Sequence, residues 1–534
     1  MKQSGRKRDF VRERAAVIER CVVFTYLFCM LGILPLYYRE QYYQIGNAKF
    51  DFFWNVSLCF IGISFILILV KRKQSVGESG MSFLEKLSAL DFAVFIYVLC
   101  VLLSYAFSDY KEFGLKGSAG WEMGLCSQLF FVAIYFILSR QKIWSKYILG
   151  IHLVVSTIVF ILGILHRFDI DPLGMYVGLE LYQKVEFLST IGQATWFSSY
   201  VCTVFAVGVS VFYISNHRRI RIFMGLYTII SFGILVTQNS DSAFAAIGGV
   251  LLLLGFYSLS EIEKWCRFWQ IMCLMWGTFG GMGILQKIFD ERMIPLDKLS
   301  IFFSQSVITW MAFFISLGML FYYTKQKNRK ETVNEVMKIT KAAYKIFLLL
   351  VAATVIGIVI FIYLNTKGYL LEWFGYQNMN QYLLFDYHWG SNRGSTWMVC
   401  WQGFVSLPWF QKLFGVGPDC LSAYLYSVPD TSDFLHQLWG EMLVTNAHNE
   451  YLNSLLCYGI VGFISWLAVL IGGIRYFYGK AKENPFFIAF ALCIMGYACH
   501  NIFCYQQVCC TPFLFIALGV GESLTKSENF NTIK

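Results

Sequence analysis

Three consecutive polar residues, His448, Asn449 and Glu450, stand where the longest polar segment of the chain meets an apolar run. The unperturbed pKa of an imidazole lies near neutral pH, so His448 is suited to accept a proton from an attacking hydroxyl group. The alternative is a neutral histidine that only forms a hydrogen bond where a helix begins. Glu450 would either assist His448 or cap the helix, because a carboxylate is favoured in a first helical turn.

A second candidate for chemistry is Arg393, in the sequence Ser-Asn-Arg-Gly-Ser. A guanidinium is a planar fork of donors that stays charged at physiological pH, which suits it to hold a diphosphate. It would also stabilise negative charge on a departing phosphate. The alternative is an interface arginine whose aliphatic part covers apolar surface while its head reaches water.

The composition defines the elements that must position these residues. The chain has 534 residues, of which 57% are hydrophobic and 14% are charged, and its mean hydropathy is +0.56. Its apolar runs repeatedly reach the roughly 20 residues that a helix needs to cross a bilayer. We therefore predict an all-α, polytopic membrane protein with about 12–14 transmembrane helices. The spans recur almost to the end of the chain, so the chemistry must lie on helix ends and loops.

The apolar runs predict about fourteen spans. They lie near 20–38, 50–70, 87–107, 121–138, 148–165, 194–214, 223–236, 243–259, 268–286, 299–323, 346–364, 448–474, 484–502 and 508–522. With both termini in the cytoplasm, most of the 43 lysines and arginines fall in cytoplasmic connections, as the positive-inside rule requires. Those basic connections also account for the net charge of +10 beside anionic lipids, so no nucleic-acid partner is expected.

One long extracytoplasmic loop, 365–447, would separate an N-terminal bundle, 1–364, from C-terminal helices, 448–534. Residues Thr396 to Phe414 are predicted to form an amphipathic helix on the bilayer surface. The aromatic residues of the loop form either an interfacial belt or platforms that stack on sugar faces; they are Trp373, Tyr376, Tyr382, Tyr387, Trp389, Trp397, Trp401, Trp409 and Trp439. On the cytoplasmic side, 324–345 is either a solvated connector or a short amphipathic helix.

The spacing His448-Asn449, nine residues, then Gly459-x-x-Gly462 resembles a motif of the bacterial O-antigen ligase and O-antigen polymerase superfamily. The Gly-Val-Gly turn at Gly415–Gly417 strengthens the resemblance. Members are integral-membrane glycosyltransferases that act on undecaprenyl-diphosphate-linked sugars. The resemblance therefore implies transfer of such a glycan to a hydroxyl group of a glycan, lipid or protein. The reaction would take place at the extracytoplasmic face of the bacterial cell membrane, without a metal or another cofactor.

The same resemblance implies roles for individual residues. His448 would be the base and Arg393 the diphosphate clamp, while Asn449 would orient the acceptor or the imidazole. Gly459 and Gly462 would let helices approach closely, as small residues do in membranes. Ligase and polymerase differ only in the acceptor, and the sequence does not distinguish them.

Three further segments resemble the family less specifically: Gly117 to Leu125, Thr190 to Tyr200 and Thr237 to Ala243. Glu122, Met123 and Asp241 stand where many relatives carry arginine, and Gln193 stands in for asparagine. Diphosphate binding would then depend on cations elsewhere, namely Arg393, Arg167, Lys184 or Lys367. Asp241 is either a functional ionisable group at the membrane edge or, as we expect, a helix cap. We expect His500 and Asn501 to form hydrogen bonds between helices. The histidines that could replace His448 are His166, His388 and His436.

A transporter or flippase is the alternative from a different class, because twelve to fourteen spans are also common there. Transport sites usually lie near the membrane midplane between internal repeats. The sequence has no evident repeat, and its polar candidates gather at the outer surface. A third hypothesis, a structural scaffold for envelope assembly, would predict that replacement of His448 has no effect.

Overall fold

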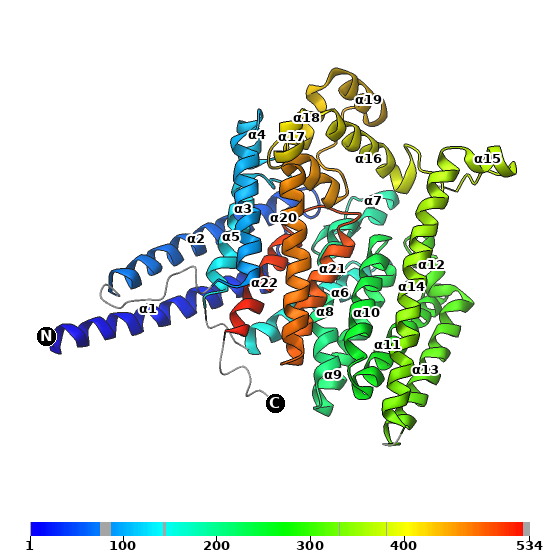
Figure 1. Cartoon of the computed structure of the whole chain (residues 1–534), viewed down its shortest axis with the longest axis horizontal. Helices are drawn as coiled ribbons and strands as arrows, with labels where there is room; N and C mark the ends of the chain where they lie inside the picture. Colours follow the sequence, from blue (N-terminus) through cyan, green and yellow to red (C-terminus); the bar gives the residue numbers. More distant parts are fainter. Residues whose placement is uncertain (1, 75–86, 142–145, 330–331, 381, 527–534) are drawn as a thin grey trace.

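The computed structural model describes residues 2–74, 87–141, 146–329, 332–380 and 382–526. This part of the chain is almost entirely helical. Its one ladder joins β1 (Phe187–Leu188) to β2 (Gly192–Gln193) in antiparallel register, with Phe187 opposite Gln193. Long helices stand side by side, and a layer of short helices covers one end of them (Figure 1).

Ten helices in the described ranges are long and apolar enough to cross a membrane. They are α1 (Lys2–Phe28, continued by a π-helical turn at Cys29–Ile33), α2 (Ile45–Gln74), α3 (Ala89–Ala106), α6 (Lys146–Arg167), α8 (Ala194–Ile214), α9 (Arg218–Thr237), α11 (Ile262–Ile288), α13 (Val307–Lys327), α14 (Val333–Thr366) and α20 (Glu450–Ala481). Four shorter apolar helices are α5 (Leu125–Leu138), α10 (Ser242–Ser258), α21 (Ile488–His500) and α22 (Thr511–Thr525). Every predicted span overlaps one of these helices, which confirms the all-α membrane fold. The predicted 12–14 exceeds the ten that are long enough by themselves.

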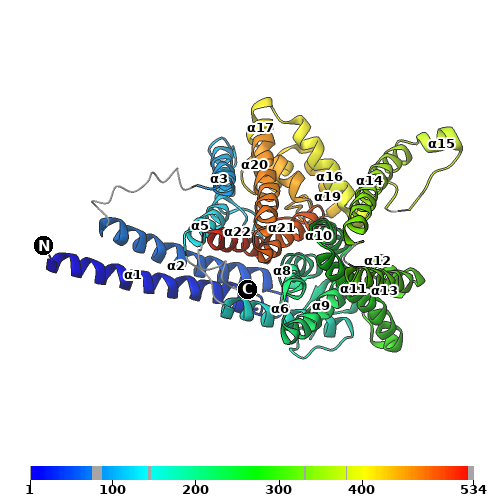
Figure 2. The ribbon, with the colours of Figure 1, turned by 60° about the horizontal axis from the view of Figure 1, so that its bottom comes forward.

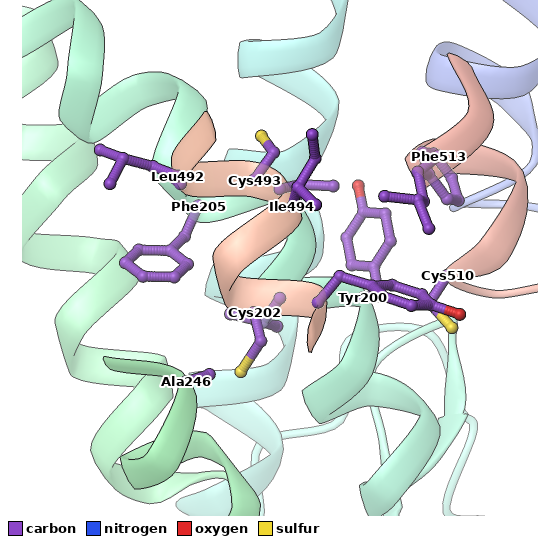
Figure 3. Packing of buried hydrophobic residues seen from close by; sticks show 14 of the residues in the cluster. Tyr200, Cys202, Phe205, Ala246, Leu492, Cys493, Ile494, Cys510 and Phe513 are labelled. Carbon is purple, nitrogen blue, oxygen red and sulfur yellow. The ribbon is translucent and has the colours of Figure 1, made fainter. Parts of the chain in front are cut away.

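The core of the bundle is built around α8, whose residues are buried on nearly every side. A helix that is apolar all round belongs in an interior. Figure 3 shows Tyr200, Cys202 and Phe205 of α8 among side chains of α10, α21 and the start of α22. A Cβ at Gly496 would lie only 2.2 Å from the carbonyl oxygen of Cys202, so glycine permits the close approach of α21 to α8.

The two edges of the bundle are less enclosed. Helices α1 and α2 lie together and project to one side, and α13 and α14 stand on the other (Figures 1 and 2). The most apolar part of α14 has no buried residue, which fits a helix that faces lipid. The predicted separate element at 324–345 is absent from its described residues: α13 continues to Lys327 and α14 begins at Val333, leaving a short connection.

Five short helices lie between α14 and α20, and the last four of them form the covering layer, which we call the cap, whereas the first projects sideways from the end of α14 (Figures 1 and 2). They are α15 (Tyr369–Phe374), α16 (Trp389–Ser406), α17 (Trp409–Phe414), α18 (Leu421–Ser427) and α19 (Pro429–Trp439). The prediction of one helix from Thr396 to Phe414 is wrong. Pro408 has no N–H to donate and disfavours helical geometry in the residue before it, so the helix stops at Ser406 and a new one starts.

The predicted glycine pair of α20 marks a kink. Gly459 has φ 67° and ψ −174° inside the helix, a conformation that is essentially confined to glycine. The carbonyl groups that the kink releases are those of Leu456 and Cys457, and they accept the N–H groups of Val416 (3.1 Å) and Gly417 (3.0 Å). The Gly-Val-Gly turn of the cap is thereby joined to α20. Gly459 thus serves a backbone bend, and the absence of a Cβ also leaves room for the backbone of Leu413 in α17.

Substitution of Gly459 by alanine should destabilise the protein, because a Cβ there would lie 2.3 Å from the backbone of Leu413. The strained conformation alone costs about 1–3 kcal/mol for a non-glycine residue. We expect a lower Tm in detergent for Gly459→Ala. The matched control is Gly472→Ala in the same helix, where a Cβ meets nothing within 4 Å. Equal melting temperatures for the two variants would contradict the proposed need for glycine at the kink.

Candidate active site

A cavity of about 590 Å³ lies beneath the cap. Four connections that gather at the same end of the bundle line it: 168–193 with the start of α8, 238–241, 289–297, and the cap with the residues before α20. Its lining residues are Val185, Glu186, Gln193, Ala194, Thr195, Asn239, Pro295, Leu296, Asp297, Asn392, Arg393, Thr396, Trp439 and His448. The structure therefore brings Arg393 and His448, which are 55 positions apart in the sequence by their numbers, onto one cavity.

The imidazole of His448 is held at the start of α20. The side chain of Asn449 caps this helix by accepting the N–H of Leu452 (2.9 Å), and Asn446 accepts the N–H of His448 (3.0 Å). His448 itself has a left-handed backbone with φ 46°, and its ring meets the ring of Tyr505 edge to face at 5.2 Å. Asn449 thus acts on the helix, and Asn446 holds the backbone of His448.

The Nδ1 atom of His448 is buried and has no hydrogen-bond partner in the described chain. Burial, and secondly the positive charge of Arg393, lower the pKa of His448 to about 4. The imidazole is therefore neutral at physiological pH and free to accept a proton. A histidine that served only to cap a helix would have its ring nitrogen occupied.

Arg393 lies in α16 with its guanidinium about 6.0 Å from the ring of Phe503. No hydrogen bond or ion pair joins this guanidinium to another described residue. Burial lowers the pKa of Arg393, yet an arginine remains charged near neutral pH. A partly desolvated cation without a partner is open to an anionic ligand, because an uncompensated buried charge is costly.

The first turns of two further helices face the same cavity. Gln193 caps α8 by accepting the N–H of Thr195 (3.1 Å), and Asp297 caps α12 (Lys298–Gln305) by accepting the N–H of Ser300 (2.6 Å). The side chain of Asn239 accepts the N–H of Asp297 (2.8 Å), which fixes one loop against another. These hydrogen bonds fix the wall of the cavity before any ligand binds.

Asp241 does not cap α10, so the prediction of a cap is wrong. Its backbone is already helical, and its side chain accepts the hydroxyl of Tyr382 (3.2 Å) instead. The other carboxylate oxygen is buried without a partner among the described residues. Burial, and then the charge of Asp297, raise the pKa of Asp241. A carboxyl group thus lies near enough to Arg393 for the two charges to interact.

Glu450 points away from the cavity, into the bundle. Its carboxylate accepts the hydroxyl of Tyr497 (3.1 Å) and the amides of Asn501 and Gln506. It is therefore neither the cap of α20 nor part of the cavity wall. Its partners lie at the end of α21 and in the loop after it, which also carries Phe503 and Tyr505. This buried network supports the residues that contact Arg393 and His448.

The prediction that His500 and Asn501 form hydrogen bonds between helices is confirmed. The Nε2 atom of His500 bonds with Ser242 of α10 (2.9 Å) and Ser198 of α8 (2.8 Å), while Asn501 bonds with Glu450 of α20. These contacts connect α21 to three neighbouring helices directly below the candidate site.

Several predicted binding residues are not brought to the cavity. The guanidinium of Arg167 is fully buried and donates to four backbone carbonyl groups, so it has no free face for a diphosphate. Lys184 pairs with Asp169 (2.8 Å), and Lys367 is exposed at the end of α14. Trp397 stacks on Phe503 and Trp389 packs against Trp397, outside the cavity lining.

Asp419 is a residue that the sequence analysis missed. It follows the Gly-Val-Gly turn and Pro418, and its buried carboxylate accepts the N–H groups of Ser118 (2.8 Å) and Met123 (3.2 Å). Burial raises its pKa to about 7. Asp419 thereby fastens the segment Gly117 to Leu125 beneath the cap. The only signal in the sequence was the position of this carboxylate directly after the Gly-Val-Gly turn and Pro418.

These features define a multi-pass membrane protein with a polar cavity at one end of its bundle. Residues 293–467 match the model of the O-antigen ligase family, Wzy_C, so this part of the chain is an O-antigen ligase family domain. The match confirms the resemblance and covers α12 to the middle of α20, including Asp297, Arg393 and His448. It implies an enzyme that transfers glycan from a lipid-linked substrate in a membrane. A comparison of the chain with curated proteins gave no match.

Proposed function

We propose that this protein transfers a glycan from undecaprenyl diphosphate to a hydroxyl acceptor at the extracytoplasmic face of a bacterial cell membrane. The observation that carries the proposal is the pair formed by Arg393 and His448. Among the described residues, neither the guanidinium of Arg393 nor the Nδ1 atom of His448 has a hydrogen-bond partner, and both residues line the cavity under the cap. The chemistry needs these two groups together: a holder for the diphosphate and an acceptor for a proton.

In the proposed reaction, the acceptor oxygen attacks the anomeric carbon of the lipid-linked sugar. The bond from that carbon to the diphosphate oxygen breaks, and the electron pair leaves with undecaprenyl diphosphate. His448 takes the proton of the acceptor hydroxyl, and Arg393 stabilises the negative charge on the leaving group. Attack from the face opposite the diphosphate inverts the configuration of the anomeric carbon, as the family resemblance implies.

A second, apolar cavity within the helix bundle supports a donor with a lipid tail. It measures about 560 Å³ and lies among α10, α11, α13 and α14, with Trp269, Trp276 and Phe279 in its wall. Phe244 of α10 and Phe303 of α12 line it with ring centroids 4.6 Å apart. The same two connections that begin α10 and α12 also line the polar cavity, so the head and the tail of one amphiphilic donor would have adjacent binding surfaces.

The location of the polar groups favours this function over a lipid-linked-sugar transporter. The polar cavity draws its residues from connections at one end of the bundle, whereas transport sites usually lie near the midplane. Whether the acceptor is a growing repeat, another lipid or a protein decides between polymerase and ligase, and both fit the proposed chemistry.

The pH dependence of turnover provides a test of the proton acceptor. Because the pKa of His448 is lowered to about 4, the base stays neutral through the weakly acidic range. We expect kcat/KM to stay nearly constant from about pH 8 to pH 5 and to be half lost near pH 4, where protonation removes the base. An anionic donor in the cavity would raise the pKa of His448, so the acid limb of kcat should lie at higher pH than that of kcat/KM. Two coincident limbs near pH 6.5 would contradict the assignment.

The function itself is tested with purified protein in nanodiscs and an undecaprenyl-diphosphate-linked oligosaccharide. Released undecaprenyl diphosphate and the transferred glycan are measured in the same reaction. We expect both products in equal amounts. Absence of turnover, together with flux of labelled lipid-linked sugar across proteoliposomes, would replace the proposal with the transporter.

A further inference from the structure

The lining of the cavity includes polar groups that the proposed reaction does not use. They are Glu186, Asp297 and Trp439, the last from the end of α19. The Oδ2 atom of Asp297 and the Nε1 atom of Trp439 are buried and have no hydrogen-bond partner among the described residues. Buried polar atoms are nearly always paired in folded proteins, so unpaired ones around a cavity call for a ligand.

These groups describe the chemistry of that ligand. A carboxylate only accepts hydrogen bonds and an indole N–H only donates one, so the ligand must offer both donors and an acceptor. A sugar ring does so through its hydroxyl groups. Its apolar C–H face would also fit against the flat ring of Trp439. A purely apolar ligand would leave Asp297 Oδ2 and Trp439 Nε1 unsatisfied.

The charges of the cavity lining restrict which sugars can bind. Among the described residues that line the cavity, Arg393 is the one cation and His448 is neutral at physiological pH, whereas Glu186 and Asp297 are two carboxylates. Asp241 lies close enough for the charge of Asp297 to raise its pKa. A diphosphate at Arg393 already places negative charge in this cavity. A second anionic group near Glu186 and Asp297 would be repelled, because like charges in a partly desolvated site interact strongly.

We infer that Glu186, Asp297 and Trp439 form a sugar-binding subsite that accepts a neutral or amino-bearing sugar and disfavours an acidic one. The inference rests on the proposed function, since it assigns the neighbouring diphosphate to Arg393. The sugar comes either from the donor, as the residue attached to the diphosphate, or from the acceptor. The recognition chemistry is the same for both: hydroxyl or ammonium donors directed at carboxylates.

Asp297→Asn removes the negative charge of this side chain and keeps its role in the fold. Asparagine caps a helix about as well as aspartate, so the bond to the N–H of Ser300 can remain. Glu186→Gln makes the same change at an exposed position. The matched control is Glu291→Gln, an exposed residue of the 3-10 turn Asp290–Arg292 that does not line the cavity.

The first arm measures binding without turnover. Diphosphate-linked prenyl sugars carrying either a neutral hexose or a hexuronic acid are titrated against the protein in nanodiscs with no acceptor present. In the second arm, a neutral donor is kept constant and turnover is compared for neutral and acidic sugar acceptors. We expect wild type and Glu291→Gln to prefer the neutral sugar by at least about tenfold in one arm, which corresponds to about 1.4 kcal/mol. That arm identifies the sugar as part of the donor or of the acceptor.

In the double variant Glu186→Gln/Asp297→Asn, the preference should fall to less than about threefold. If wild type shows no preference in either arm, or the double variant keeps the full preference, the subsite is wrong. The experiment distinguishes a failure of the sugar subsite from a failure of the proposed glycosyltransferase function. Selective binding in the first arm without any turnover would support the subsite and overturn the glycosyltransferase.

Discussion

His448→Asn should lower kcat by about 10²- to 10⁴-fold, the range that a general base contributes. Asparagine tolerates the left-handed backbone of position 448 better than most residues, so the start of α20 should be retained. The substitution removes the imidazole, whose Nδ1 atom has no hydrogen-bond partner in the described chain, together with its ring contact to Tyr505. KM for the donor should change little, because Arg393 and the proposed sugar subsite of Glu186, Asp297 and Trp439 remain. The measurement is the release of undecaprenyl diphosphate under saturating donor.

The control for this substitution is His436→Asn. His436 lies on α19 in the same cap, is exposed, bonds with the carbonyl group of Gly440 through Nδ1 (3.0 Å) and has its ring 5.3 Å from that of Tyr426. Its replacement should leave kcat within about twofold of wild type. If His448→Asn behaves like this control in a working assay, His448 is not the base and the scaffold hypothesis gains support.

Arg393→Gln is expected to reduce kcat by about 10²- to 10³-fold, the usual effect of removing one group that stabilises developing negative charge. Arg393→Lys should recover part of this loss, since lysine keeps the charge but not the planar fork that suits a diphosphate. Comparing the glutamine and lysine variants separates the effect of the positive charge from the effect of the planar guanidinium. Donor affinity should weaken in both variants, more in the glutamine variant.

Loss of Arg393 should also change the pH profile. The positive charge of Arg393 is the second cause of the lowered pKa of His448, so its removal should raise that pKa. The acid limb of the residual activity of Arg393→Gln should therefore move to higher pH. The control, Arg292→Gln, changes an exposed arginine outside the polar cavity and should alter neither rate nor profile. Full activity of Arg393→Gln would exclude Arg393 as the diphosphate clamp.

The helices of this protein could be predicted from the sequence because lipid imposes a local constraint. Every backbone polar group in a bilayer core must be paired within its own helix, so a long apolar run such as that of α14 has one available structure. The same argument located all the apolar helices, including the short α5 and α10. It did not give their ends, which depend on caps and prolines such as Gln193 and Pro408.

The candidate pair was also accessible from the sequence, through residue type. Imidazole can accept a proton and guanidinium can hold a diphosphate, and the spacing from His448 to Gly462 carried the family resemblance that the match over 293–467 confirms. The division of the chain at 365 and 448 and the roles of both residues stay predictions.

The tertiary structure decided which groups accompany His448 and Arg393. Arg167 and Asp297 are both charged residues near helix ends. The local sequence does not indicate which of them lines the cavity. Packing buried the guanidinium of Arg167 among four carbonyl groups and left an oxygen of Asp297 without a partner beside the cavity. Long-range contacts also gave Asp419 its role, because its partners Ser118 and Met123 are about 300 positions away. Local sequence fixes which groups a segment can offer, whereas burial and hydrogen bonding to distant segments determine which of them remain free for a substrate.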